Sequence, residues 1–431
     1  MLTATASFVW GAATSGPKPT YTKDVLPILQ NRCQGCHRPG EIGPMAFLSY
    51  KETRPWAKAI KEAVVSRKMP PWFADPHYGK FSNDRSLSPQ EIETLTAWVD
   101  SGAPEGNPKD APAPRQWTDG WAIDNPDAVV QMPKPFHVAA KGTVDYQYIV
   151  VPTGFTEDKW VQTVEARPTA RNVVHHVVVY IREPGSKWLR GEAEPGVPFV
   201  PPKKTPDGKD RDDIVGGGND VLTIYTPGNS PDTFRSGQAK KIKAGSDLVF
   251  QMHYTASGKD ADDQTRVGMV FAKQPPKQRV MTLFLGKNDF VIPPGDPNFA
   301  YTADAELPTA STLLSFFPHM HVRGKAFEYK LQLPGSEPET LLHVSNYNFN
   351  WQLTYRLEKP VFMPAGSKFI LTAWWDNSAN NRFNPDPKSE VRFGEQSWEE
   401  MMVGFVDVAV DADMDRQQFW KKKDKAQAKA D

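Results

Sequence analysis

Cys33-Gln34-Gly35-Cys36-His37 is the stretch of this chain with the strongest structural consequence. The Cys-x-x-Cys-His spacing is the attachment signature of a c-type haem, in which two thiols take the haem vinyl groups and the histidine binds the iron. Cys33 and Cys36 are the only cysteines in the chain, so a zinc site built on cysteines lacks partners. The signature therefore predicts one covalent haem c, with His37 as an axial ligand.

The second axial ligand is expected downstream of His37, in a loop that can place a soft donor over the iron. Met69 is the first choice because Pro70 and Pro71 follow it and favour an extended loop. Methionine ligation raises the haem potential relative to two histidines. Met45 and His77 are the alternatives, and Met69 as an ordinary packing residue is a third interpretation.

Residues 20–106 around the motif have a helical pattern. Apolar residues recur at helical spacing over 56–67 and again over 88–102. Ser88, followed by Pro89 and Glu91, predicts a helix start with a capping box, and Gly102 predicts the helix end. Helix, haem loop, helix, ligand loop and helix in this order resemble the small cytochromes c fused to exported bacterial enzymes. The resemblance implies a small all-α cytochrome c domain over 20–106.

The period changes after residues 107–139, whose proline- and charge-rich start is typical of a linker. Short runs rich in Val, Ile, Phe and Tyr then alternate with turn residues, which predicts β-sandwich or barrel domains. We expect two all-β sandwiches, over 140–280 and 281–414, and a charged tail over 415–431. Strands are expected over 146–152, 160–166, 173–181, 248–255, 267–272, 327–333, 369–375 and 402–410.

Composition restricts the partners and the compartment. Lys+Arg and Asp+Glu both number 51, and this balance gives no support for a nucleic-acid partner. No apolar run reaches the about 18 residues of a transmembrane helix, so no transmembrane segment is predicted. Residues 1–19 lack a basic start and are interpreted as a signal remnant or a disordered segment. Covalent haem attachment takes place outside the bacterial cytoplasm, so we expect a periplasmic or otherwise extracytoplasmic protein.

Five of the nine histidines fall in three strand-like contexts. A single buried histidine is usually a hydrogen-bonded core residue, but five in β-segments, with two of the contexts doublets, favour metal binding. His319 and His321 share one strand face because side chains alternate along a strand. His175 and His176 point to opposite faces of a regular strand, so both can bind one metal only at a twist, a bulge or a strand end. The fifth histidine is His253.

Ligand type narrows the choice of metal. Imidazole suits zinc, copper, iron and nickel, whereas a thioether partner selects copper, above all the cuprous ion. Met401, in Glu400-Met401-Met402, is a candidate thioether, although a Met-Met pair at a strand start is more commonly core packing. The isolated His77, His137 and His343 are expected to be surface or packing residues, with a supporting role for His343 near a metal as the alternative.

In order and spacing, these motifs resemble the copper type II, ascorbate-dependent monooxygenases, which include peptidylglycine α-hydroxylating and dopamine β-monooxygenases. The resemblance covers residues 140–412. It implies two jelly-roll sandwiches whose two coppers face each other across a cleft. The copper that receives electrons would be held by His175, His176 and His253. The oxygen-binding copper, the catalytic site, would be held by His319, His321 and Met401.

The chain departs from the peptide-hydroxylating members of this family at two positions. Phe317 stands where those enzymes have an arginine for the substrate carboxylate, and Phe405 stands where they have a tyrosine. These departures argue against a peptide with a free C-terminus as substrate. Phe316, Phe317 and Phe405 suggest a less polar molecule, or simply core packing.

The resulting hypothesis is C–H hydroxylation of a small organic substrate by O2. Two copper ions carry the chemistry, and the haem takes electrons from an external donor protein in place of ascorbate. Tethering the haem raises its effective concentration to about millimolar for a short linker. Three alternatives remain: a non-catalytic electron-transfer module, an accessory subunit of a larger complex, and a peroxide-driven enzyme.

Overall fold

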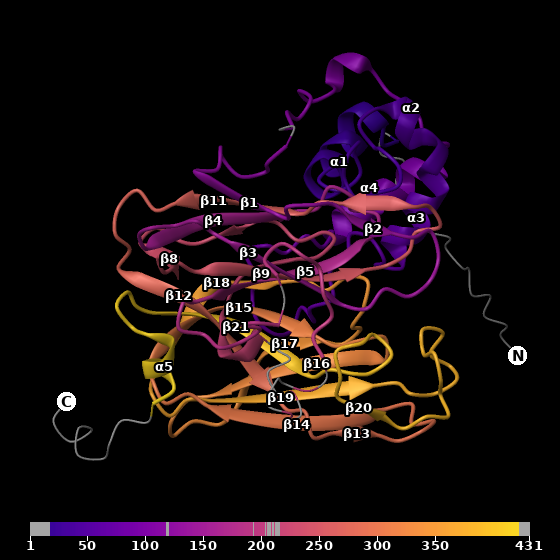
Figure 1. Cartoon of the computed structure of the whole chain (residues 1–431). Helices are drawn as coiled ribbons and strands as arrows, with labels where there is room; N and C mark the ends of the chain where they lie inside the picture. The colour runs from indigo at the N-terminus through magenta and orange to yellow at the C-terminus, as the bar shows by residue number, and fades with distance from the viewer. Residues whose placement is uncertain are drawn as a thin grey trace, which may run out of the picture. The chain divides into compact units, whose positions relative to one another are not determined.

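The computed structural model describes residues 18–117, 120–192, 194–202, 204, 208, 211 and 216–421. The chain divides into two compact units (Figure 1). Unit 1 extends to Pro71 and resumes over Arg85–Gln116, and unit 2 comprises Trp72–Asp84 and the chain from Trp117 onward. The expected segment 1–19 lies outside the described residues up to residue 17.

The described part of unit 1 consists of helices and turns around one small apolar core. Val25, Leu29, Leu95 and Trp98 are fully buried in that core, with Cys33 packed against it. The unit contains η1 (Tyr21–Val25), α1 (Leu26–Arg32), α2 (Tyr50–Thr53), η2 (Arg54–Trp56), α3 (Ala57–Val65), α4 (Pro89–Asp100) and η3 (Pro108–Asp110).

The helix predicted to begin after Ser88 is present as α4, and its capping box is confirmed. The Glu91 amide donates to Ser88 Oγ over 3.1 Å, and the Ser88 amide donates to Glu91 Oε2 over 2.7 Å. A cap of this kind stabilises a helix by about 1 kcal/mol. Gly102 follows the helix with a φ of +95°, the left-handed conformation that glycine adopts without strain.

Unit 2 consists mainly of β-sandwich-type sheets with few helices, which confirms the β-rich expectation. Each of the eight predicted strands is present, with bounds that differ by at most a few residues. The strands of the first half are β1 (Ala128–Gln131), β2 (Phe136–Val138), β3 (Gln147–Pro152), β4 (Lys159–Arg167), β5 (Val174–Arg182), β6 (Asp220–Tyr225), β7 (Asp232–Thr233), β8 (Gln238–Ile242), β9 (Asp247–Tyr254), β10 (Ala261–Asp263) and β11 (Arg266–Phe271), with η4 (Gly216–Gly218).

The second half continues from β12 with the same alternation of strands and turns. It contains β12 (Gln278–Gly286), β13 (Val291–Ile292), β14 (Phe299–Glu306), β15 (Ser311–His319), β16 (Gly324–Gln332), β17 (Glu339–Val344), β18 (Tyr355–Met363), β19 (Lys368–Trp375), β20 (Val391–Arg392), β21 (Val403–Asp411) and α5 (Arg416–Phe419).

The sheets of unit 2 stack as layers in two sandwiches (Figure 1). In the first sandwich, sheet β3-β9-β5-β6 covers strands β1-β11-β4-β8, and in the second, sheet β14-β19-β16-β17 covers strands β12-β21-β15-β18. A short parallel pairing of β8 with β12 joins the edge strands of these two layers, so that they form one nine-stranded sheet. The predicted division between residues 280 and 281 therefore falls inside β12, and the loop between the two sandwiches, which share a sheet, is 272–277.

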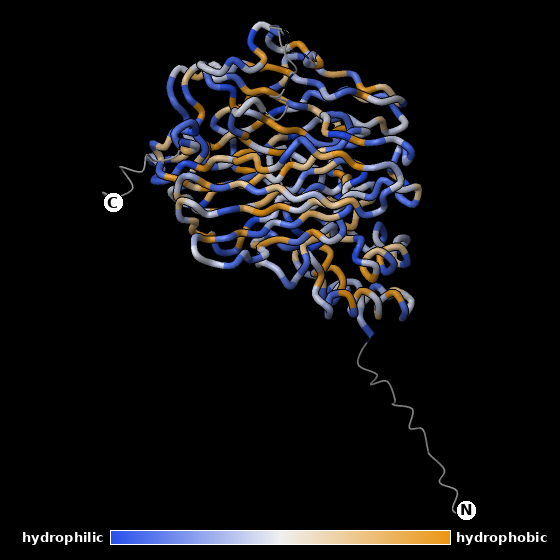
Figure 2. The backbone as a smooth tube through the Cα atoms, turned by 90° about the horizontal axis from the view of Figure 1, so that it is seen from below, coloured by the Kyte–Doolittle hydropathy of each residue, from blue (hydrophilic) through white to orange (hydrophobic). Residues whose placement is uncertain are grey.

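Alternate side chains along the strands of the second sandwich fill its core. Along β19 every second residue is buried, and Phe369, Leu371, Ala373 and Trp375 are fully buried in the second core. Figure 2 shows this alternation as hydrophobic and hydrophilic segments that follow each other along the strands. Strands with this period bury one face because successive side chains point to opposite sides.

The two sandwiches also pack on each other, face to face. The outer face of sheet β3-β9-β5-β6 contributes Tyr148, Val178 and Tyr180, and the facing strands β15 and β21 contribute Phe317 and Phe405. Burying a large apolar side chain stabilises a fold by about 1.5–3 kcal/mol. In the described chain the two halves therefore meet along this packed interface rather than across an open cleft.

Three segments differ from the sequence-based divisions. β1 and β2 lie inside the stretch 107–139 expected to be a linker, and Met132 of that stretch is buried in the first core. Residues 72–84 belong to unit 2, although they lie inside the range 20–106 expected as one domain. Phe419, in the expected charged tail, is fully buried in the second core. No helix of the described chain is long and apolar enough to cross a membrane.

A buried ionic network joins the two sandwiches within the shared sheet. Lys240 of β8 donates to Thr282 Oγ1 over 2.6 Å and lies 3.5 Å from Asp407 of β21. Burial alone would raise the pKa of Asp407, but Lys240 and hydrogen bonds from Thr282 and Ser315 lower it. Asp407 is therefore ionised and depends on these partners.

We expect Lys240→Met to lower the free energy of unfolding by about 3–5 kcal/mol, because it leaves the Asp407 carboxylate buried without its cation. The double variant Lys240→Met/Asp407→Asn should recover most of the loss. Urea unfolding at neutral pH measures both. The exposed pair Lys368 and Asp304 supplies the control, since Lys368→Met should cause no comparable loss. An equal loss of unfolding free energy in Lys240→Met and Lys368→Met would contradict the role assigned to the Lys240–Asp407 pair.

Candidate metal centre

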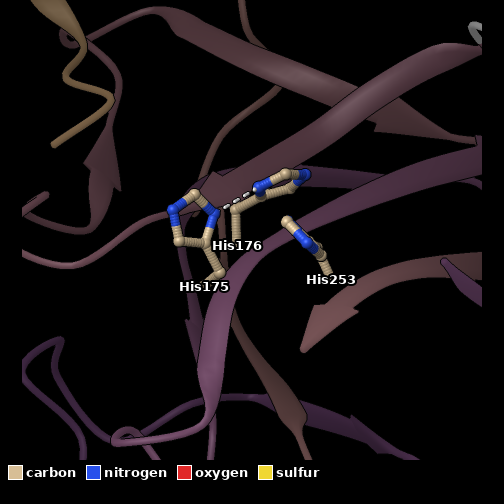
Figure 3. A group of neighbouring side chains, drawn as sticks. All are labelled: His175, His176 and His253. Carbon is tan, nitrogen blue, oxygen red and sulfur yellow. Dashed lines mark hydrogen bonds between the residues drawn. The ribbon is translucent and has the colours of Figure 1, made fainter. Parts of the chain in front are cut away.

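A β-bulge at the start of β5 brings His175 and His176 together. The pairing of β5 with β9 shifts register between Val174 and His176, so the side-chain alternation is interrupted at His175. The two imidazoles converge, with 3.1 Å between their Nδ1 atoms (Figure 3). The sequence allowed both to share one site only at a twist, a bulge or a strand end, and the bulge supplies that condition.

His253 completes a group of three imidazoles. It stands directly opposite His176 on the neighbouring strand β9. One nitrogen from each of His175, His176 and His253 lies within 4.8 Å of the other two. Nitrogens bound to one metal are at most about 4.2 Å apart, twice the metal–nitrogen distance, so small ring rotations suffice to close the site. Tyr146 stacks on His253 with 4.5 Å between ring centroids and limits its movement.

Burial keeps these three imidazoles neutral. It lowers the pKa of His175 to about 4 and lowers the pKa of His176 and His253 well below the ordinary value, with the neighbouring histidines adding to the effect. His175 Nε2 and His253 Nδ1 are inaccessible to water and have no hydrogen-bond partner. An unpartnered buried polar atom costs free energy. A metal ion would use such lone pairs, so the residues present fit one.

His319 and His321 follow at the end of β15 and in the turn after it. His319 Nδ1 donates to Gln352 Oε1 over 2.7 Å, and His321 Nδ1 donates to the Glu399 carbonyl over 3.2 Å. These bonds fix each ring and leave its Nε2 as the available donor atom, and His321 Nε2 is buried without a partner. Burial lowers the pKa of His319 to about 4 and lowers that of His321 well below its ordinary value.

Glu400 holds the turn that carries His321. Its carboxylate accepts the His321 amide over 2.9 Å, the Arg323 amide over 2.7 Å and Trp375 Nε1 over 3.0 Å. Burial raises the pKa of Glu400 to about 7, and the three donors oppose that rise. The Glu400 carboxylate thus fixes the backbone on both sides of Val322. Met401, the next residue, packs in the interface between the two sandwiches.

Met401 lines a small cavity next to the histidines. The cavity has a volume of about 20 Å³, room for one water molecule. Met401 is 6% exposed and shares the cavity with His176 and His319. The other lining residues are mainly apolar or aromatic and include Tyr146, Val178, Tyr180, Ile224, Gln251, Phe317, Gln352, Val403 and Phe405.

All five predicted histidines therefore meet in one cluster, in which His175 is half-buried and the other four are buried. The His176 and His319 rings are 5.5 Å apart and the His319 and His321 rings 5.2 Å apart. The resemblance implied two ligand sets that face each other across a cleft. In the described chain the sheets that carry them are packed together, because apolar side chains from both sheets fill the interface.

The haem motif lies in the turn after α1 in unit 1, where Cys33 and Cys36 are both half-buried. His37 Nδ1 donates to the Met45 carbonyl over 3.1 Å, and its ring stacks on Phe47 at 4.5 Å. Burial lowers the pKa of His37, so the imidazole is neutral and its Nε2 is the nitrogen available to iron. The local geometry fits an axial ligand.

The candidate second ligands occupy different surroundings. Met69 is half-buried at the end of unit 1, and its amide donates to the Ala63 carbonyl over 3.2 Å. Met45 packs against the apolar core of unit 1. His77 belongs to unit 2, where it is exposed and paired with Asp75 at 2.6 Å.

Two residues that contact the histidines were not indicated by the sequence alone: Gln352, which bonds to His319, and Tyr146, which stacks on His253. Gln352 lies in a loop and is 2% exposed, and no spacing motif connects it to His319. Tyr146 precedes β3, and the strand pattern around it predicts that its side chain is buried. The pattern does not indicate that the ring stacks on His253. His343 lies 3.8 Å from Asp75, and His137 pairs with Asp262 on the surface.

Comparisons with known proteins identify no relative. No protein-family model and no curated protein matches the chain. Among solved structures, the major capsid protein P2 from bacteriophage PM2 is 9% identical with a TM-score of 0.24, and the match covers 66% of this chain and 97% of that chain. Allantoicase is 11% identical with a TM-score of 0.17 and coverage of 56% and 81%. Likeness at this level identifies neither a family nor an activity.

The metal-free protein should lose stability as the pH falls. Folded His175 and His319 have a pKa of about 4, whereas unfolded histidine has about 6.5. Between these values the unfolded state binds more protons, so the free energy of unfolding decreases with decreasing pH. Thermal unfolding of chelator-treated protein across this window measures the effect. His319→Gln should give a shallower slope, and equal slopes would contradict the assignment.

Glu400→Gln should lower the free energy of unfolding by about 1–3 kcal/mol, because an amide nitrogen replaces one acceptor among three buried donors. The measurement belongs at about pH 8, where most of the carboxylate is ionised. The matched control is Glu390→Gln on the surface, which should change the free energy by less than about 0.5 kcal/mol. A Glu400 loss no larger than the Glu390 loss would contradict the role.

Proposed function

We propose that this chain is an exported haem- and copper-containing monooxygenase that hydroxylates a C–H bond with O2, related to the copper type II monooxygenases. The observation that carries the proposal is the cluster of five neutral histidines, three of which, His175, His253 and His321, have a buried nitrogen without a hydrogen-bond partner. Imidazoles with a nearby thioether suit copper better than the harder divalent metals.

Two ligand sets follow from this proposal. His175, His176 and His253 would hold one copper, and His319, His321 and Met401 would hold the other. Copper would supply one-electron redox chemistry and the activation of O2. Glu400 belongs to neither set, because its carboxylate accepts hydrogen bonds from the His321 and Arg323 amides and from Trp375.

The surrounding residues orient the ligands and keep water out. Gln352 and the Glu399 carbonyl fix which nitrogen of His319 and His321 is available. Phe317 and Phe405 cover the cavity beside Met401 and favour an apolar surrounding. A water-poor site strengthens every electrostatic interaction inside it.

Unit 1 would serve as the electron inlet. We propose that it is the predicted cytochrome c domain, with Cys33 and Cys36 linked to one haem and His37 and Met69 as axial ligands. An external donor protein would reduce the haem. A tethered one-electron carrier suits a centre that accepts electrons singly, and tethering replaces a diffusional encounter.

A non-catalytic electron-transfer or accessory role is the second candidate. The cavity beside Met401 has room for one water molecule and not for an organic substrate. A closed cluster of this kind suits a metal that passes electrons without binding a substrate. Oxygen consumption with a reduced cytochrome donor and coupled product formation separates an enzyme from this alternative.

Metal analysis of the purified chain tests the cofactor set directly. We expect one haem iron and two coppers per chain in protein matured with copper available. A variant with His253→Ala should lose one copper and keep the haem, since the haem motif lies in the other unit. Absence of copper from the wild-type protein would refute the proposal.

Met401→Ile should abolish oxygen-dependent product formation while the haem spectrum stays unchanged. Isoleucine keeps the apolar volume and removes the thioether, so the cavity stays filled but the soft donor is lost. The matched control is Met402→Ile, because Met402 is buried in the core of the second sandwich. Turnover that survives Met401→Ile would show that the site assignment is wrong.

A further inference from the structure

Residues 72–84 form a strap, a segment that leaves the helical unit, packs on the second sandwich and returns. The chain belongs to unit 1 up to Pro71 and again from Arg85. Between these points Ala74 forms a β-bridge with Val344, and Phe81 forms one with Leu357. No local pattern predicts that residues 72–84 leave the helical unit, and this departure interrupts the range 20–106 expected for the haem domain.

Trp72 and Phe81 fix the strap in the second core. The Trp72 ring lies 4.9 Å from the Tyr355 ring, and the Phe81 ring lies 5.6 Å from it. Tyr355 is 1% exposed and is the first residue of β18. Both strap aromatics therefore rest on the same buried tyrosine.

The first residue of the strap is close along the chain to a proposed haem ligand. Only Pro70 and Pro71 separate Met69 from Trp72. Three residue steps span at most about 11 Å, whatever path the backbone takes. If Met69 binds the haem iron, Trp72 is the nearest aromatic residue of unit 2 along the chain.

Tyr355 in turn is close along the chain to the metal centre. Leu353 and Thr354 separate it from Gln352, whose Oε1 accepts a hydrogen bond from His319 Nδ1 over 2.7 Å. Tyr355 also stands opposite Phe316 on β15, the strand that ends at His319. Two short connections of covalent and hydrogen bonds thus join the tyrosine to one proposed copper ligand.

We propose that Trp72 and Tyr355 form the internal route by which electrons pass from the haem to the copper centre, arriving at His319. The inference rests on the proposed function and extends it. It differs from what the family resemblance implies, in which electrons reach the copper held by His175, His176 and His253. Here the route ends on the other ligand set, and the 5.5 Å between the His176 and His319 rings connects the two.

The transfer balances as a one-electron step. The haem iron is oxidised from ferrous to ferric, and one copper is reduced from cupric to cuprous. No bond forms or breaks and no proton moves. An external one-electron donor protein then restores the ferrous haem. In this proposal Trp72 and Tyr355 bind neither metal and act as positioning residues. Their aromatic rings and the short bonded connections beside them would couple the haem iron to the copper better than solvent would.

The test follows the haem rather than turnover. Full-length protein with ferric haem and cupric copper is kept anaerobic, and a light pulse with a soluble flavin donor places one electron on the haem. The decay of the ferrous-haem absorbance then reports transfer to copper. Copper-free protein sets the baseline, in which the ferrous haem should persist.

Trp72→Leu should slow this decay severalfold, and Trp72→Phe should restore most of the rate because an aromatic ring returns. Phe81→Leu is the matched control: it removes the other strap aromatic from the same tyrosine but lies further along the chain from Met69, so the rate should stay at the wild-type value. Two glycines inserted between Pro71 and Trp72 should also slow the decay, since they lengthen the connection and leave the core contacts in place.

Each result decides the inference. A wild-type rate in Trp72→Leu, or an equal slowing in Phe81→Leu, would overturn the route and leave the proposed function standing. If Trp72→Leu does not fold, the glycine insertion decides in its place. Copper-loaded wild-type protein whose ferrous haem never reoxidises would overturn the inter-cofactor transfer itself, and metal analysis already separates that case from missing copper.

Discussion

The packing of two sheets against each other is the constraint on which the rest of the structure depends. Sheet β3-β9-β5-β6 of one sandwich lies on strands β15 and β21 of the other, with tyrosines on one side and phenylalanines on the other. The same contact places His176 and His253 beside His319. One apolar interface therefore assembles the fold and brings together histidines that are far apart in the sequence.

That interface also sets the chemistry of the histidines. Burial disfavours the charged form of imidazole, so the cluster is neutral under conditions in which an exposed histidine is partly protonated. Neutral imidazoles with unpartnered nitrogens are unfavourable for the empty fold and favourable for a metal ion. Stability without metal and affinity for metal are thus opposed, and the pH dependence of the metal-free protein measures that opposition.

The strap links this centre to the helical unit through the chain itself. Its two aromatic side chains rest on Tyr355, and its first residue follows closely on Met69. A tether alone would raise the effective concentration of a haem carrier. Here the end of the tether is itself packed in the second core through Trp72 and Phe81.

The sequence by itself determined the haem signature, the capped helix after Ser88, the alternating strands and the identity of the histidines, because these depend on local spacing and period. The alternation of side chains along a strand also required a twist, a bulge or a strand end for His175 and His176 to share a site. Only the tertiary structure decided that a bulge meets that condition, that Gln352 and Glu399 orient His319 and His321, and that residues 72–84 pack in the second sandwich. Those outcomes depend on contacts between residues that are distant along the chain, which no local pattern encodes.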